Sequence, residues 1–300
     1  MGRVYEALSK GERAPVLGAD GEEKAAGIPT PDDPRRSEGE RFDFVPYSLE
    51  APTLTEIHRI RKNEEIALET RTVMTRPSRT VELDQRRCDY RLTPSYECGS
   101  RISDEFNRAA VAMISAAAEC PIKKVLITAA DHGSGKTLTA INLAFALASA
   151  RKRVLLIDCD LERPSILRML SLQADLGLSE IINPDVRPGD GAIELAPSGV
   201  TIIPLRAPVE NSAELLGNSG FRSLLGTFEA DYDFMLFDSG PLLHSADARL
   251  LARLTDRVIL VISAGSVTSS ELGRAIGALN KEQILGVVLN RFQERAGAIN

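Results

Sequence analysis

The chain has 300 residues, a net charge of −6 and a hydrophobic fraction of 43%. This balance is ordinary for a globular protein. The net negative charge of the whole chain argues against a nucleic-acid-binding protein. The longest apolar stretch, from Ala140 to Ala150, is interrupted by Asn142 and is too short to span a bilayer. The first residues, MGRVYEALSK, hold no apolar segment of the signal-peptide kind, so we expect a cytoplasmic protein.

The N-terminal part differs in character from the rest of the chain. Residues 11–55 hold several prolines and charged clusters such as EGERFD, and their apolar periodicity is weak. Such a segment buries too little apolar surface to offset the entropy lost on ordering. We therefore expect a largely disordered extension over residues 1–96, with short helical islands near Val4–Leu8 and over 54–74.

From residue 97 to residue 300 the sequence alternates between strand and helix patterns. Ser103 is a plausible N-cap for a helix that runs to about Glu119 and ends before Pro121. Further strands are expected at 124–130, 153–158, 200–205, 234–238, 257–263 and 285–290. Further helices are expected at 137–150, from Pro164 onward, and at about 212–228, 246–254 and 269–280. Short apolar runs alternating with helices predict an α/β domain with a doubly wound, mostly parallel sheet of the P-loop NTPase type.

The stretch ITAADHGSGKT, residues 127–137, predicts a phosphate-binding loop. It follows a strand and precedes a helix, and Gly133 and Gly135 let backbone amides approach phosphate oxygens. Lys136 is expected to reach the β- and γ-phosphates, and Thr137 to bind Mg²⁺. A glycine-rich turn with an incidental Lys-Thr is the alternative, but the flanking strand and helix argue against it.

Two aspartate motifs lie at the ends of later strands. In VLLIDCDLERP, Asp158 and Asp160 come at the carboxyl edge, where open α/β sheets bind ligands. Asp160 is a candidate base for an attacking hydroxyl, and Asp158 is a candidate for catalysis and for holding Mg²⁺ through water. In YDFMLFDSGP, Asp238 follows four apolar residues, which is typical of a Walker B strand, and is a further Mg²⁺ candidate. The alternatives are that Asp160 caps the next helix and that Asp238 is a turn residue.

These three motifs, in this order, resemble those of the bacterial tyrosine kinases (BY-kinases), which act in capsule and exopolysaccharide assembly. The middle motif, with two aspartates before Arg-Pro, is the discriminating one. The likeness covers about residues 97–295 and extends to GVVLNRF, where the resemblance places Asn290 near the adenine base. It implies that residues 97–300 form an ATP-binding kinase domain. The implied nucleotide contacts are Gly133, Ser134, Gly135, Lys136, Thr137, Leu138 and Asn290, with ATP and Mg²⁺ as cofactors.

Several positions depart from the family pattern. Glu162 stands where the family usually has Arg, with Arg163 next to it. The oligomerisation motif Glu-x-x-Arg-x-x-Arg begins with Glu105 and Arg108 but has Val111 in place of its last Arg, so only a possible homo-oligomer is implied. The C-terminal tyrosine cluster is missing, and autophosphorylation on such a tail is not expected. We hypothesise that one of four tyrosines in or near the N-terminal part replaces it: Tyr5, Tyr47, Tyr90 or Tyr96.

The resemblance implies a cytoplasmic kinase that a separate membrane adaptor, of the polysaccharide co-polymerase type, recruits to the inner face of the membrane. Tyrosine-containing proteins are the implied substrates, and nucleic acid is not an expected partner. Two alternatives remain open. One is an ATPase of the Min/Par partitioning type, although Asp131 stands where that family carries an extra Lys. The other is a nucleotide-binding regulatory subunit without kinase activity.

Overall fold

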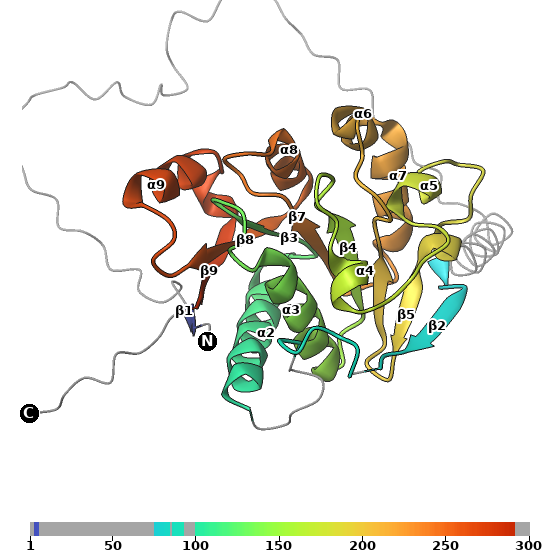
Figure 1. The fold of residues 1–300 in the computed structure, drawn as a ribbon, viewed down its shortest axis with the longest axis horizontal. Coiled ribbons are helices and arrows are strands. Elements are labelled where there is room, and N and C mark those ends of the chain that lie inside the picture. The colour runs from blue at the N-terminus through green and yellow to red at the C-terminus, as the bar shows by residue number, and fades with distance from the viewer. Residues whose placement is uncertain (1–2, 6–74, 85, 93–99, 292–300) are drawn as a thin grey trace, which may run out of the picture. The chain divides into compact units, whose positions relative to one another are not determined.

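The computed structural model describes residues 3–5, 75–84, 86–92 and 100–291 (Figure 1). Within these residues, nine strands form one sheet in the order β1-β9-β8-β3-β7-β4-β6-β5-β2. The strands are β1 (Arg3–Tyr5), β2 (Arg79–Glu82), β3 (Lys124–Ala129), β4 (Val154–Cys159), β5 (Ile193–Ala196), β6 (Val200–Ile203), β7 (Phe234–Ser239), β8 (Arg257–Ser263) and β9 (Ile284–Asn290). The run from β9 to β6 is parallel throughout, whereas β1 pairs antiparallel with β9 and β5 pairs antiparallel with β6. The predicted mostly parallel α/β sheet is confirmed.

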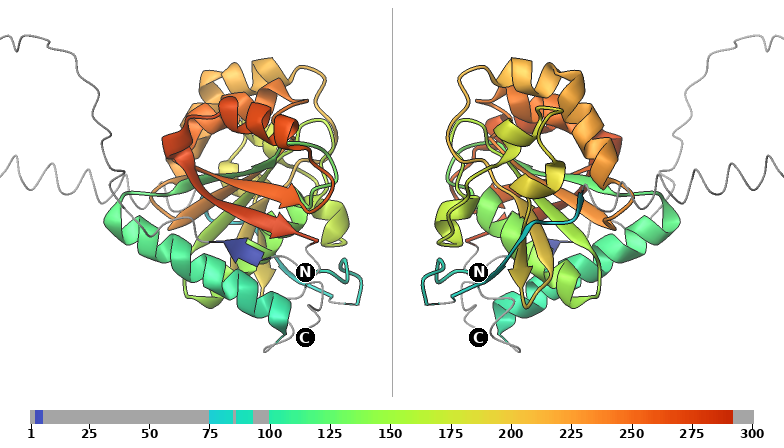
Figure 2. Two further views of the ribbon diagram at one scale, coloured as in Figure 1. Left: turned by 90° about the vertical axis from the view of Figure 1, so that its left-hand side faces the viewer. Right: turned by 90° about the vertical axis from the view of Figure 1, so that its right-hand side faces the viewer.

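Helices cover both faces of the sheet (Figure 2). They are α2 (Arg101–Glu119), α3 (Lys136–Ser149), α4 (Ile166–Met169), α5 (Leu178–Ile181), α6 (Ser212–Gly217), α7 (Ser219–Phe228), α8 (Ala246–Leu254) and α9 (Ser269–Gly277). Short 3-10 turns add Pro188–Gly191 and Lys281–Gln283.

Alternate residues of the buried strands serve two separate cores, because successive side chains point to opposite faces of a sheet. On one face Val125, Leu156 and Leu236 pack with residues of α2 and α3. On the other, Leu126 and Phe237 pack with residues of α6, α7, α8 and α9. Because side chains alternate between the two faces, the position of a residue in its strand determines whether it faces α3. The side chains at the strand ends that face α3 form the functional site.

Two helices differ from their predicted bounds for local reasons. α2 begins at Arg101, not after Ser103, because the hydroxyl of Ser100 accepts the hydrogen bond of the Ser103 N–H at 3.1 Å. The expected helix at 212–228 is two helices, since Asn218 takes an extended conformation and its side chain caps α7 by accepting from the Gly220 N–H at 2.9 Å. Ser100 is thus the N-cap, and Ser103 is the third helical residue, whose backbone N–H is capped by Ser100.

The N-terminal part contributes to the sheet, which the sequence analysis does not anticipate. β2 pairs in parallel with β5, from Arg79 opposite Ile193 to Glu82 opposite Ala196. Downstream of it, Leu92 is only 4% exposed and belongs to the core on the α3 face. The domain therefore includes residues 75–92, upstream of the expected boundary at 97. A four-residue edge strand with one half-buried side chain has too weak an apolar pattern to be recognised in isolation.

The extreme N-terminus also differs from expectation. The helical island expected near Val4–Leu8 begins instead in a strand: Arg3–Tyr5 form β1, which pairs with β9 at the edge of the sheet. The helix expected over 54–74, the disorder expected over 11–55, and Tyr47 and Tyr96 lie outside the described residues. Across the residues that the structure describes, no helix has the length and apolarity needed to cross a membrane.

Candidate functional site

The loop between β3 and α3 has the backbone geometry of a phosphate cradle. Gly133 and Gly135 both take left-handed conformations, with φ of +70° and +92°. Such φ values are strained for residues that carry a Cβ. They turn the loop so that α3 begins at Lys136, whose side chain is only 6% exposed. Leu138, one of the expected nucleotide contacts, packs partly against the core on the α3 face.

Asn290 contacts this loop from the end of β9. Its Nδ2 donates to the Ser134 carbonyl at 2.9 Å, and its Oδ1 accepts from the Arg291 N–H at 2.9 Å. A Cβ added to Gly135 would collide with Nδ2 of Asn290, so glycine is required there for space as well as for φ. In this structure Asn290 therefore supports the loop, whereas its expected place near the adenine base stays a prediction.

Asp158 and Asp238 stand directly opposite each other on the neighbouring strands β4 and β7. Each lies two residues beyond a leucine of the α3-face core, so both carboxylates point toward the side where α3 begins. Both side chains are fully buried. Burial raises the pKa of each group above its ordinary value; the charge of Asp158 adds to the rise for Asp238, and the charge of Asp160 adds to the rise for Asp158. Two adjacent buried carboxylates are unfavourable unless hydrogen-bond donors, protons or a cation compensate their charge.

The two carboxylates differ in their hydrogen-bond partners. Oδ2 of Asp158 accepts from the backbone N–H groups of Ser165 and Ile166, both at 3.1 Å, and its Oδ1 accepts from Asp160 N at 3.3 Å. Among the described residues, neither oxygen of Asp238 has a hydrogen-bond partner within normal range. The Thr137 hydroxyl and the Lys136 charge lie close enough to Asp238 to oppose the rise of its pKa. Asp158 thus caps α4, and Asp238 is the carboxylate left available.

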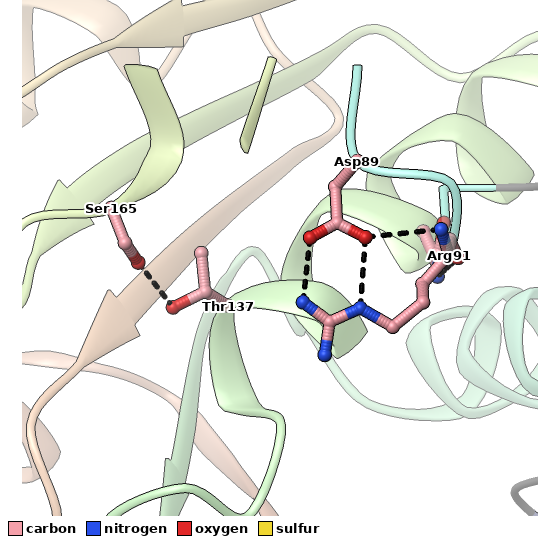
Figure 3. Close-up of polar contacts among 5 residues, drawn as sticks. Asp89, Arg91, Thr137 and Ser165 are labelled. Atoms are coloured by element: carbon pink, nitrogen blue, oxygen red, sulfur yellow. Dashed lines mark hydrogen bonds and ion pairs between the residues drawn. The ribbon is translucent and has the colours of Figure 1, made fainter. Parts of the chain in front are cut away.

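Thr137 is held in the same place by α4. The Ser165 hydroxyl donates to Oγ1 of Thr137 at 3.0 Å, which ties the first turn of α3 to the start of α4 (Figure 3). The described residues hold no group of three or more His, Cys, Asp or Glu side chains arranged to bind a metal. Mg²⁺ does not require one, since it is usually bound by one or two carboxylates and by substrate phosphates. The orphaned Asp238 carboxylate beside the Thr137 hydroxyl fits such an ion.

Asp160 lies just beyond β4 and is 6% exposed. Its Oδ1 accepts from the Arg163 N–H at 3.1 Å, and a Cβ on Gly240 would come within 3.7 Å of the same oxygen. Burial raises the pKa of this carboxyl, while the Lys136 ammonium opposes the shift. The helix-capping role considered for Asp160 belongs to Asp158, which accepts from the first amides of α4.

Two histidines, His132 in the phosphate loop and His244 after β7, lie together, and the sequence motifs do not predict this contact. Nε2 of His244 lies 3.1 Å from Oδ1 of Asp131, and the same oxygen accepts from the His132 N–H at 2.6 Å. The rings of His132 and His244 stack with their centroids 5.4 Å apart. The pKa of His132 is lowered, chiefly by burial and then by the charges of Arg163 and Lys136. Asp131 therefore joins the phosphate loop to the segment after β7 within one chain, and the Arg163 charge faces the same loop.

Comparisons with known proteins agree with this site. Residues 125–299, more than half of the chain, match the CbiA family, the CobQ/CobB/MinD/ParA nucleotide binding domain. The chain is 34% identical over 172 residues to the tyrosine-protein kinase YwqD of Bacillus subtilis, covering 56% of this chain and 72% of that protein. It is 30% identical over 195 residues to the putative tyrosine-protein kinase CapB of Staphylococcus aureus, covering 64% and 86%.

Solved structures include similar domains. The VpsO kinase domain is 30% identical, with a TM-score of 0.56, covering 65% of this chain and all of that one. The chimerical protein CapA2B2 is 23% identical, with a TM-score of 0.65 and coverage of 73% and 96%, and shows the likeness of fold. The phosphate loop, the two aspartate motifs and these relatives lead to one conclusion. The chain belongs to the BY-kinase family, with a P-loop domain of the CobQ/CobB/MinD/ParA type.

Proposed function

We propose that this protein is an ATP-dependent protein-tyrosine kinase that regulates the synthesis and export of exopolysaccharide or capsule. The observation that carries the proposal is Asp160, a buried carboxyl with a raised pKa beside Lys136. A carboxyl whose pKa is raised is a stronger proton acceptor than an ordinary carboxyl, which suits it to take the proton of a phenol during transfer. Relatives that share about a third of the aligned residues are named tyrosine-protein kinases, which supports this choice of acceptor.

In this proposal the residues act mainly by positioning and charge. Backbone amides from Gly133 to Thr137 and the Lys136 ammonium hold the phosphates of ATP. Thr137 and Asp238 would hold Mg²⁺, and Asp158 would contribute to the same site through water. Bound Mg²⁺ neutralises charge on the β- and γ-phosphates. Asp160 receives the proton of the attacking tyrosine, Leu138 packs behind the loop, and Asn290 keeps the loop in shape.

The proposed partners follow from the resemblance to the family. A separate membrane adaptor of the polysaccharide co-polymerase type would hold the kinase at the inner face of the membrane, and tyrosine-containing proteins would be substrates. A homo-oligomer through α2 is a further proposal. Arg108 pairs with Glu105 of its own helix at 3.0 Å, and Val111, 60% exposed, offers an apolar contact where the family motif has Arg.

Two other functions compete with the kinase. A partitioning ATPase shares the domain, but Asp131 occupies the position of its extra Lys and pairs with His244 in the same chain. A regulatory subunit that only binds nucleotide has no need for Asp160 beside Asp158 and Asp238. The kinase therefore accounts for more of the site than either alternative.

Radiolabelled ATP, given to the purified full-length protein together with a Glu-Tyr copolymer, tests the proposal. We expect label on tyrosine, and its loss in Lys136→Met. Lys281→Met, an equivalent change at an exposed lysine of the Lys281–Gln283 turn, is expected to keep wild-type transfer. Release of inorganic phosphate without labelled tyrosine would favour the partitioning ATPase. Binding without either product would favour the regulatory subunit.

A further inference from the structure

Tyr90 is presented to solvent at the corner of a turn. Its side chain is 88% exposed, the highest value among the large hydrophobic and aromatic residues of the described part of the chain that stand out at the surface. The Leu92 N–H donates to the Asp89 carbonyl at 2.9 Å, which closes a β-turn with Tyr90 as its second residue. The Arg91 guanidinium lies over the ring, 5.8 Å from its centroid.

Hydrogen bonds hold the backbone on both sides of Tyr90, although the side chain itself is exposed. Before it, the Asp89 N–H donates to the Met169 carbonyl at 2.8 Å. After it, the Arg91 carbonyl accepts from Asn142 Nδ2 at 3.3 Å, and Leu92 is buried. Asp89 and Arg91 also form a two-pronged ion pair, with N–O distances of 2.8 and 2.6 Å (Figure 3). The side chain of Tyr90 is therefore held in solvent by a constrained turn, where another protein molecule can reach it.

The turn rests on the two helices that build the nucleotide site. Met169 ends α4, whose first amides are held by Asp158. Asn142 belongs to α3, about 9 Å along the helix from Lys136 at a rise of about 1.5 Å per residue. Tyr90 is therefore carried beside the catalytic region, yet its ring is in solvent while Lys136 and Asp160 are each 6% exposed. Since the turn is anchored, Tyr90 is not expected to reach the γ-phosphate bound to its own chain.

We propose that Tyr90 is an autophosphorylation site and that a second copy of this chain phosphorylates it. This inference rests on the proposed kinase function. The phenolic oxygen of Tyr90 forms a bond to the γ-phosphorus of ATP held by the other copy, and the bond from that phosphorus to the bridging oxygen breaks. The products are phosphotyrosine and ADP, and the phenolic proton passes to Asp160 of the copy that holds the ATP.

Tyr232, the other tyrosine whose side chain the structure describes, is not a suitable acceptor. It is 7% exposed and its ring lies 6.1 Å from that of Phe228 in the core on the opposite face. Burial raises the pKa of its phenol. Tyr5, Tyr47 and Tyr96 complete the five tyrosines of the chain, and they enter the experiment as competing acceptors.

Tandem mass spectrometry of the full-length protein, incubated with ATP and Mg²⁺, locates the phosphate. We expect it on Tyr90, and we expect Tyr90→Phe to lose most of its phosphotyrosine while Tyr96→Phe keeps it. Thermal unfolding of Tyr90→Phe should match wild type, because an exposed ring contributes little to stability. Phosphate on another tyrosine, with none on Tyr90, overturns the inference and leaves the kinase function intact.

A mixing experiment tests transfer between copies. Lys136→Met protein serves as acceptor and Tyr90→Phe protein as donor, so a phosphopeptide containing Tyr90 can come only from the acceptor chain. We expect that phosphopeptide, and its absence while the donor still labels a Glu-Tyr copolymer overturns transfer between copies. If neither the copolymer nor any tyrosine of the wild-type chain is labelled, the proposed function itself fails.

Discussion

Asp158 and Asp238 occupy the same register on adjacent strands, yet their carboxylates have different partners. Three backbone N–H groups donate to Asp158, whereas Asp238 has no hydrogen-bond partner within normal range in the described part of the chain. An unpaired buried carboxylate costs free energy unless a cation or a proton compensates it. We therefore infer that the Asp238 carboxylate by itself lowers the stability of the folded chain and serves to bind Mg²⁺.

Asp238→Asn tests this attribution. In the absence of nucleotide we expect the unfolding temperature to rise by about 2–4 °C, the shift that roughly 1 kcal/mol produces in a domain of this size. With ATP and Mg²⁺ we expect phosphoryl transfer to fall by about 100-fold or more, as a Mg²⁺ contact is lost. Calorimetry and the radiolabel assay measure the two effects.

Asp256→Asn is the matched control. Oδ2 of Asp256 accepts from the backbone N–H groups of Lys123 and Lys124 at 2.8 and 2.7 Å, so its charge is used for stability. We expect this variant to lose about 1 kcal/mol of stability, since hydrogen bonds to a charged acceptor are weakened. If Asp238→Asn also lowered the unfolding temperature without nucleotide, the account of an uncompensated carboxylate would be wrong.

At the scale of elements, α4 is a single helical turn whose position depends on side chains from other elements. Asp158 of β4 caps its N-terminus, Thr137 of α3 bonds to Ser165, and Asp89 of the N-terminal segment bonds to its last residue, Met169. A four-residue helix has little stability of its own, because helix formation has a costly nucleus. The site is therefore organised by tertiary contacts that meet at α4.

Asp158→Ala should loosen α4 specifically. It removes the acceptor for the amides of Ser165 and Ile166, a loss of about 1–2 kcal/mol for a helix cap. Hydrogen exchange at these two amides should become faster, while exchange in the strands stays near wild type. Asp160→Ala, which leaves both bonds in place, should not change the exchange of these amides. Equal exchange in the two variants would show that Asp158 is not the cap.

The strand β2 and the turn that follows it bring the N-terminal segment into the domain. We expect a chain of residues 75–300 to unfold at a higher temperature than one of residues 97–300. The longer form keeps β2 on β5 and keeps Leu92 in the core, and removing a buried leucine side chain typically costs about 2–5 kcal/mol. Thermal denaturation of the two forms at equal concentration measures the difference. Identical unfolding temperatures would restore the boundary at residue 97.

At the scale of the whole molecule, nucleotide and metal are expected to stabilise the fold, because a bound Mg²⁺ would compensate the buried charge of Asp238. At a ligand concentration about 100 times its dissociation constant, binding adds about 2.7 kcal/mol to the free energy of unfolding. ATP with Mg²⁺ should therefore raise the unfolding temperature by several degrees, and chelation of Mg²⁺ with EDTA should reverse most of the rise. Lys136→Met should show no rise, and a rise that survives EDTA unchanged would argue against the metal site.

The accuracy of the sequence predictions follows the length and periodicity of each element. The strands at 257–263 and 285–290 and the helix at 246–254 are found within a residue or two of their predicted bounds, since each buries a strongly patterned face. β2 and β5 have no counterpart among the predicted strands, because a strand of four residues carries little pattern and β2, at the sheet edge, has only one half-buried side chain. Ser100 and Ser103 could not be separated as caps by residue type, since both are serines and only the backbone conformation distinguishes them.

The sequence by itself determined the class of fold, the phosphate loop and the set of aspartates, because these depend on local patterns of period two, glycine spacing and residue type. Only the tertiary structure decided how those groups are used. It showed that Asp158 caps α4, that Asp238 accepts no hydrogen bond of normal length from the described residues, and that Asp131 pairs with His244. It also placed the exposed Tyr90 on the helices of the site. These contacts join residues far apart in the chain, so they depend on sheet order and register, which no local pattern contains.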